Sequence, residues 1–355
     1  IRRGAPQRGD IIFTREAPVG EVGVLEDDDG VFLGQRTMMY RTAREKADNY
    51  YLFYTLSSRF CQKQIEDFSN GGTVAHMRVP DCGEILINLP PLPEQKKIAQ
   101  ILSTWDKAIT TTEQLLANSQ QQKKALMQQL LTGKKRLLDK NGVRFSGAWK
   151  TARLGQIGEI KSAGVDKKIV KDETPVRLLN FTDVFKRSFI YSNELNHWVT
   201  APESKVVGCN VVQGDVFFTP SSETRNEAGI PAVAVEDIPN CCYSYHVVRF
   251  RISEQWDLNF KAYAFTTLEF RKQVNLLADG SGQRYVVSQD AFRNISVTYP
   301  DFDEQQAIGR LLRIAEDEII TLQQKLDALK LEKKALMQQL LTGKRRVKLE
   351  NKEVT

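Results

Sequence analysis

The stretch KKALMQQLLTGK occurs twice in this sequence, at Lys123–Lys134 and again, letter for letter, at Lys333–Lys344. The copies lie 210 positions apart, and twelve identical residues in register do not arise by chance. The same spacing pairs residues upstream: Glu94-Gln95 with Glu304-Gln305, Ile98 with Ile308, Pro90 with Pro300, Gly72 with Gly282, Phe60 with Phe270 and Asn49 with Asn259. The chain therefore contains a duplicated unit of roughly two hundred residues, and such a repeat decides the architecture.

Each copy ends in a long segment whose apolar residues step by four and three, the a/d pattern of a coiled coil. Prolines before the first segment and Gly133 and Gly343 after the last apolar positions are typical of helix ends. A helix of about 40 residues spans roughly 60 Å. The predicted seam, which also offers a surface for partner docking, comprises Ile98, Leu102, Trp105, Ile109, Thr112, Leu116, Ser119, Lys123, Leu126 and Leu130, then Ile308, Leu312, Ala315, Ile319, Leu322, Leu326, Leu329, Lys333, Leu336 and Leu340.

These helices could pair in two ways, either between two chains or within one chain. Heptad segments more commonly join two chains, which would give a dimer. The exact duplication instead favours pairing within one chain, as an antiparallel coiled coil.

The segment between the helices reads as a mixed α/β domain with a β-rich centre. Val- and Phe-rich runs punctuated by Gly and Pro predict strands, and WKTARLGQI (149–157) predicts an opening strand or turn. A helical stretch is predicted over 260–277, and the three tryptophans Trp149, Trp198 and Trp256 are predicted to lie in the core. The fold class is α+β: globular domains at 1–93 and 137–300 alternate with long helices at 94–136 and 301–346, before a tail at 347–355.

The first globular domain is expected to be incomplete. RGDIIFTRE (Arg8–Glu16) aligns with QGDVFFTPS (Gln213–Ser221), but the second copy has about 65 further residues upstream that the first lacks. We therefore expect an N-terminally truncated first domain with unpaired strand edges.

Composition excludes several classes of protein. The formal charge of +6 is compatible with nucleic-acid binding, and the five scattered cysteines form neither a disulfide framework nor a CxxC metal site. No apolar run long enough to span a membrane and no signal peptide is seen, so a cytoplasmic location with reduced thiols is expected. A phosphate loop, a methyltransferase tetrapeptide and a glycine-rich nucleotide fingerprint are all missing, which predicts a non-catalytic protein without a metal or cofactor of its own.

The paired plan of domain, helix, domain, helix resembles the specificity subunit of type I restriction-modification systems. PLPEQKKIAQIL (91–102) heads the first helix, LLTGKKRL (130–137) closes it, and RGDIIFT and QGDVFFT resemble a central strand motif of that family's target-recognition domains. The resemblance implies reading of a bipartite double-stranded DNA target with a gap set by the helices. It also implies docking of two modification subunits that use S-adenosylmethionine, and assembly with motor and nuclease subunits that use ATP and Mg²⁺. The complex would then be an adenine-specific methyltransferase and an ATP-dependent endonuclease.

Candidate DNA contacts lie on polar loops that follow predicted strands and carry donors and acceptors able to read base edges. A lysine cluster around Gly164 is a candidate for phosphate contact, although a solvated face is its ordinary interpretation. The predicted contacts are Thr14, Arg15, Gly72, Thr73, His76 and Arg78 in the first domain, and Lys167, Lys168, Thr219, Ser221, Ser222, Thr224, Arg225, Asn226, Gln283, Arg284 and Tyr285 in the second.

Two rival functions remain open at this point. A homodimeric coiled-coil scaffold or adaptor without intrinsic DNA specificity would show the same heptads. An enzyme with an unrecognised site would cleave or methylate DNA as the purified chain alone.

Overall fold

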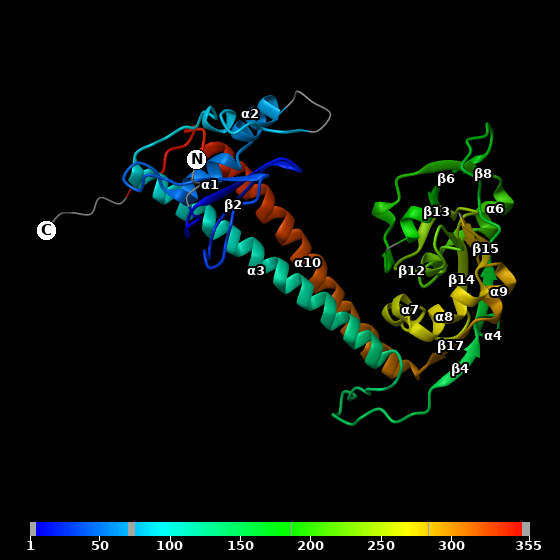
Figure 1. The fold of residues 1–355 in the computed structure, drawn as a ribbon. Coiled ribbons are helices and arrows are strands. Elements are labelled where there is room, and N and C mark those ends of the chain that lie inside the picture. Colours follow the sequence, from blue (N-terminus) through cyan, green and yellow to red (C-terminus); the bar gives the residue numbers. More distant parts are fainter. Residues whose placement is uncertain (1–4, 70–74, 186, 283, 350–355) are drawn as a thin grey trace. The chain divides into compact units, whose positions relative to one another are not determined.

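A computed structural model describes residues 5–69, 75–185, 187–282 and 284–349 (Figure 1). The chain forms two compact units. The first unit comprises Ile1–Leu116 and Thr321–Thr355, and the second comprises Ala117–Ile320. Each unit therefore contains one globular domain and part of both long helices.

The two long helices are α3 (Leu92–Leu130) and α10 (Phe302–Leu340), each of 39 residues. Within the first unit, Lys330 pairs with Glu113 at 2.8 Å and Lys333 pairs with Asp106. Within the second unit, Lys123 pairs with Glu316 at 3.3 Å. Residue numbers that rise on one helix as they fall on the other identify an antiparallel pair, and Figure 1 shows the two helices side by side. The predicted intramolecular pairing is confirmed.

The seam residues predicted from the heptads all lie on α3 or α10. Every one is buried or half-buried, including the polar Thr112 and Ser119. Ile98 and Leu102 pack against Leu340 in one core cluster, and Leu130 packs near Ile308 and Leu312 in another. Full burial of a leucine contributes about 1.5–3 kcal/mol, so this seam supplies much of the helices' stability.

The helices end earlier than predicted, at Leu130 and Leu340, while the predicted ranges ran to 136 and 346. Gly133 (φ +67°) and Gly343 (φ +72°) adopt the left-handed conformation, and Lys135 N and Arg345 N bond back to the carbonyls of Gln129 and Gln339. Gly133 N and Gly343 N also bond to the carbonyls of Leu130 and Leu340. The left-handed glycines therefore turn the chain just after each helix, and each helix ends three residues before its glycine.

Just after each helix end, an arginine forms an ion pair with a glutamate at the start of the other helix. Arg136 donates two bonds of 2.5 Å to the fully buried carboxylate of Glu304, which also accepts from Trp149. Arg346 donates in the same way to Glu94, at 2.6 and 2.5 Å. We call these two pairs the helix-end clamps. Removing Arg136 would leave the fully buried Glu304 unpaired, which costs about 3–5 kcal/mol. The Arg346 side chain is 67% exposed, so its pair with Glu94 contributes less.

In the first unit a three-stranded antiparallel sheet of order β2-β1-β3 packs beneath two short helices. Within the described part of this unit, β2 and β3 have no further partner strand. The elements are β1 (Ile11–Arg15), β2 (Val19–Val24), β3 (Thr37–Tyr40), α1 (Asn49–Leu56), α2 (Arg59–Ser69) and the 3-10 turn η1 (Asp81–Gly83).

The second unit holds four sheets around two apolar cores. A five-stranded sheet has the order β5-β14-β10-β12-β7, and a four-stranded sheet has the order β8-β6-β13-β9. The strands are β4 (Lys150–Arg153), β5 (Gly158–Lys161), β6 (Thr174–Leu179), β7 (Phe189–Ile190), β8 (Trp198–Ala201), β9 (Asn210–Val211), β10 (Val216–Phe218), β11 (Ser221–Ser222), β12 (Pro231–Ala234), β13 (Ile238–Tyr243), β14 (Val248–Ile252), β15 (Asp279–Ser281), β16 (Arg284–Val286) and β17 (Ser296–Tyr299).

The helices of the second unit are short and lie between these strands. They are α4 (Leu154–Ile157), α5 (Phe181–Val184), α6 (Glu203–Gly208), α7 (Leu258–Ala264), α8 (Leu268–Leu277) and α9 (Gln289–Asn294), with 3-10 turns η2 (Ser192–Glu194) and η3 (Arg225–Glu227).

Some predictions for the second unit need correction. The helical stretch 260–277 is two helices, because the Thr267 side chain caps the start of α8 by accepting from Phe270 N. Trp256 lies in the core as predicted and Trp149 is half-buried, but Trp198 is 50% exposed, with the guanidinium of Arg177 5.4 Å from its ring. All five cysteines are buried and unpaired, as expected of reduced thiols.

The internal alignment also needs a one-residue shift. Asp48 caps α1 and its N–H donates to Gln95, while Asp257 caps α7 and its N–H donates to Gln305. Asp48 and Asp257 are therefore equivalent, and the offset between the copies is 209 positions here, not 210. The pairings of Asn49 with Asn259 and of Phe60 with Phe270 are wrong. Cys61 takes the place of Phe270, and both are buried. The predicted pairing of Gly72 falls outside the described residues.

Over the ranges that the structure describes, none of the helices combines the length and apolar character needed to cross a membrane.

Candidate nucleic-acid interface

The two loops predicted to touch DNA in the second unit meet in one small sheet. β16 pairs with β11 on one side and with β15 on the other, so that Ser222 lies opposite Tyr285. The loop after β10 and the glycine turn near 280 are 60 residues apart in sequence, yet they form one continuous surface.

Two arginines project from this sheet. The guanidinium of Arg225 lies 5.0 Å from the centre of the Tyr285 ring, a cation–π geometry that leaves its N–H groups exposed. Arg284 donates to Ser221 Oγ at 3.2 Å and is otherwise exposed. Arginines with free donors on a preformed surface suit phosphate oxygens and the O6 and N7 atoms of guanine.

A close aromatic pair, tilted by 38°, lies near Arg284 and was not among the predicted contacts. The rings of Tyr245 and His246 have centroids 3.9 Å apart, and Tyr245 is 49% exposed. Burial, together with the positive charges of Lys167 and Arg284, lowers the pKa of His246, which Asp166 opposes. A neutral imidazole presents one donor and one acceptor, which can read a base edge. We call Lys167, Arg225, Tyr245, His246, Arg284 and Tyr285 the recognition patch.

A buried brace holds the loop that carries Arg225. Arg271 on α8 donates to the carbonyls of Asn226 (2.6 Å) and Gly229 (2.8 Å), and Asn275 donates to Asn226 Oδ1 at 2.9 Å. Burial lowers the pKa of Arg271, whose donors are used inside the protein. The loop is thus fixed by α8, as preorganised recognition requires.

Several predicted contacts have side chains already engaged inside the fold. Thr219 is fully buried and its hydroxyl accepts from Ile230 N, so it has no exposed group for DNA. This burial contradicts its prediction as a base contact, because the hydroxyl is needed to close the loop. Ser222 and Thr224 bond to Glu227, and Lys168 pairs with Asp166 at 2.9 Å.

The first unit offers fewer free groups. Thr14 accepts from Glu21 N, and the guanidinium of Arg15 donates to the carbonyls of Gln35 and Met77. His76 lies 3.8 Å from Glu16, and Arg78 makes two bonds to Asp81. The predicted contacts Gly72, Thr73 and Gln283 lie outside the described residues, and a DNA contact by any of the others remains a prediction.

No group of three His, Cys, Asp or Glu side chains in the described ranges is placed to hold a metal ion. The recognition patch contains hydrogen-bond donors and acceptors and a tilted pair of rings.

Comparison with known proteins places this geometry in a family. The sequence model described as "Type I restriction modification DNA specificity domain" matches residues 5–118 and 147–331. The chain is 28% identical to the type I restriction enzyme MjaVIII specificity subunit of Methanocaldococcus jannaschii, over 98% of this chain and 85% of that protein. It is 25% identical to the putative MjaX specificity subunit of the same organism, over 96% of this chain and 79% of that protein.

A solved structure agrees at the level of the fold. The S subunit of a type I restriction-modification system from M. genitalium has a TM-score of 0.59 at 17% identity, covering 94% of this chain and 83% of that chain. Because the family match extends over both domains and most of both long helices, the chain belongs to the type I restriction-modification DNA specificity family, whose members are non-catalytic specificity subunits.

Proposed function

We propose that this specificity subunit reads a bipartite double-stranded DNA target, one half through each unit, with a gap set by the paired helices. The observation that carries the proposal is the duplication, because each copy supplies one globular domain and one 39-residue helix. A helix of this length rises about 58 Å, enough to hold two readers a helical turn of DNA or more apart. The recognition patch supports the reading of the second half-site.

The subunit further docks two modification subunits, one at each end of the helix pair. The two helix-end clamps support this stoichiometry, because they give both ends the same buried framework. S-adenosylmethionine is bound by those partners, which methylate adenine. ATP and Mg²⁺ are bound by the motor and nuclease subunits.

DNA binding by the chain together with its modification subunits tests the proposal. We expect a sequence-specific complex in a mobility-shift assay, with affinity that falls as salt rises because phosphate contacts release counterions. The alternative, a coiled-coil scaffold without DNA specificity, predicts no preference among duplexes at either low or high salt. Absence of specific binding with the modification subunits present would overturn the proposal.

A further inference from the structure

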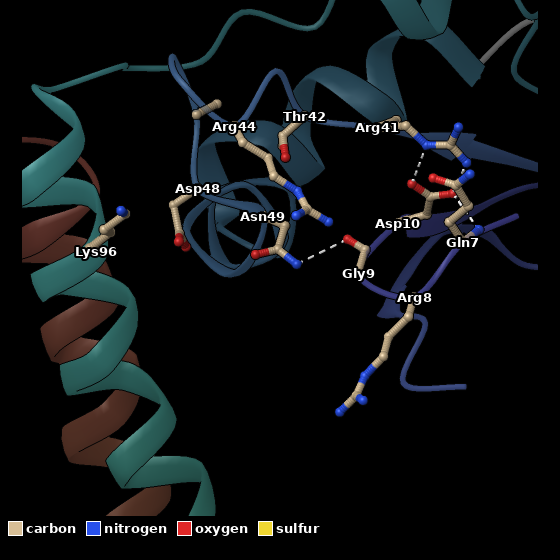
Figure 2. Close-up of a pocket in the computed structure, with 11 residues that line it drawn as sticks. Gln7, Arg8, Gly9, Asp10, Arg41, Thr42, Arg44, Asp48, Asn49 and Lys96 are labelled. Atoms are coloured by element: carbon tan, nitrogen blue, oxygen red, sulfur yellow. Dashed lines mark hydrogen bonds and ion pairs between the residues drawn. The ribbon is translucent and has the colours of Figure 1, made fainter. Parts of the chain in front are cut away.

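A polar cavity of about 390 Å³ opens in the first unit, where the turn before β1 meets the start of α1 and α3 (Figure 2). Four cationic side chains and two carboxylates line it. They are Arg8, Arg41, Arg44, Lys96, Asp10 and Asp48. The cavity is large enough for a small ligand or a segment of a larger one.

Part of the lining is committed to the fold. Asp10 pairs with Arg41 at 2.6 Å, Asp48 accepts from Tyr51 N at the start of α1, and Asn49 donates to the carbonyl of Gly9. Figure 2 shows the bonds of Arg41 to Asp10 and of Asn49 to Gly9. Asp10 is thereby paired with Arg41, whereas Asp48 accepts only a backbone N–H, so the rest of the charged lining consists of three cations and one carboxylate.

Those three cations come from three different segments: Arg8 from the turn before β1, Arg44 from the loop before α1, and Lys96 from α3 (Figure 2). All three are exposed. Within the described part of the chain, none of these side chains forms an ion pair, and none of them donates a hydrogen bond. Three cations outnumber the one carboxylate, Asp48, that is not paired with Arg41, so this part of the lining is net positive and favours an anion.

The second unit shows that the fold does not need these cations. It keeps the framework: Asp215 and Arg251 replace Asp10 and Arg41, Asp257 replaces Asp48, and Lys261 donates to Gly214 where Asn49 donates to Gly9. The cations themselves are not kept. The position equivalent to Arg8 is Gln213, and that equivalent to Lys96 is Gln306. Arg44 corresponds to Ser253 or Glu254.

We propose that this cavity binds a phosphate group, and that its source is the DNA backbone. The inference rests on the proposed function and adds a backbone anchor to the first unit. Charge-assisted bonds from arginine and lysine to phosphate oxygens are strong, and such contacts fix the register of a protein on DNA without reading sequence. Free phosphate shares this chemistry and is distinguished by experiment.

The double variant R8Q/K96Q tests the site, because both glutamines already occupy the equivalent positions of the second unit. The matched control is R59Q/K63Q, which removes two exposed positive charges from α2 of the same unit. Affinity of the assembled methyltransferase for its target is measured from 50 to 200 mM salt. Loss of one phosphate contact should weaken binding to all sequences and reduce the slope of log K against log salt by about 0.9. The control should leave the slope unchanged.

A second readout separates the sources of phosphate. The melting temperature of the chain is measured with inorganic phosphate and with chloride at equal ionic strength. An unchanged DNA slope, combined with phosphate stabilising the natural chain but not R8Q/K96Q, would assign the cavity to free phosphate and reject DNA. If neither readout distinguishes R8Q/K96Q from R59Q/K63Q, the phosphate site is overturned. Failure of the proposed function would give a different result, because the natural complex itself would then show no specific DNA binding.

Discussion

Asp10 and Asp215 perform the same task in the two units. Each is buried, accepts a backbone N–H from three residues earlier and pairs with an arginine, Arg41 or Arg251. The aspartate thus ties the turn before the central strand to the end of the neighbouring strand. The glycine before it, with φ +93° at Gly9 and +83° at Gly214, makes the turn possible.

Substituting Asp10 should destabilise the first unit in a pH-dependent way. The hydrogen-bonded Arg41 guanidinium holds the pKa of Asp10 below its usual range. The pair therefore stabilises the fold above about pH 4, and this stability is lost as pH falls through the lowered pKa. D10N should cost about 1–3 kcal/mol at pH 7 in urea unfolding, with a difference that shrinks below about pH 4. The exposed Asp67 supplies the control D67N, and an equal effect of both variants would contradict the prediction.

His246 should make DNA binding depend on pH. Its pKa is lowered by burial and by Lys167 and Arg284, so the ring stays neutral until the pH falls below the ordinary histidine range. Protonation then adds a positive charge to the recognition patch, so DNA affinity should rise only as the pH falls below the ordinary histidine value of 6.5. H246Q should flatten this rise, whereas H197Q, at an exposed histidine of the same unit, should preserve it. A titration of affinity against pH that is identical for H246Q and the natural chain would refute the assignment.

The sequence predicted part of this surface. The loops with Arg225 and Arg284 were found because glycine, serine and arginine after a strand mark an exposed turn. Tyr245 and His246 were missed because they lie in a run of Val, Tyr and Phe that reads as a buried strand. Thr219 was misjudged since a buried hydroxyl that closes a loop has the same sequence signal as an exposed one.

Among the elements, the long helices were predictable because their periodicity is local and repeats over many turns. The strands of the second unit depend on partners distant in sequence, such as β6 beside β13, and a sequence pattern does not specify such pairings. The break at Thr267 was missed because it depends on a side-chain cap rather than on a Gly or Pro. The helix ends were predicted too late, because Lys, Arg and Leu continue beyond the closing glycines.

The glycine that ends α10 gives a test at this scale. A Cβ at Gly343 would meet no atom within 4 Å, so only its φ of +72° opposes a side chain. G343A should therefore cost about 1–2 kcal/mol, seen as a lower urea midpoint. The matched control is G83A, where a Cβ also meets open space but φ is not positive. Equal midpoints for G343A and G83A would show that the left-handed turn does not constrain the helix end.

At the scale of the whole molecule, the helix pair should act as a ruler. Inserting one heptad between Ser119 and Gln120 and another between Ile320 and Thr321 keeps the seam in phase. The added length is about 10 Å, which is about three base pairs. Methylation mapping of the assembled complex should then find a gap about three base pairs longer with unchanged half-sites. Seven residues inserted instead at the exposed Asn141 turn should leave the gap unchanged, and a gap indifferent to both insertions would refute the ruler.

The helix-end clamps have a consequence for assembly. Each copy of the repeat carries both clamp partners, Glu94 with Arg136 and Glu304 with Arg346, and each acid is satisfied by the base of the other copy. Such an interface is isologous, so a polypeptide of one copy alone is complementary to itself. The natural chain is in effect a homodimer whose two copies are covalently linked. Pairing of the copies therefore depends on the effective concentration set by the linker and not on the protein concentration. Only the seam and clamps must then stay matched, and the two globular domains are free to diverge.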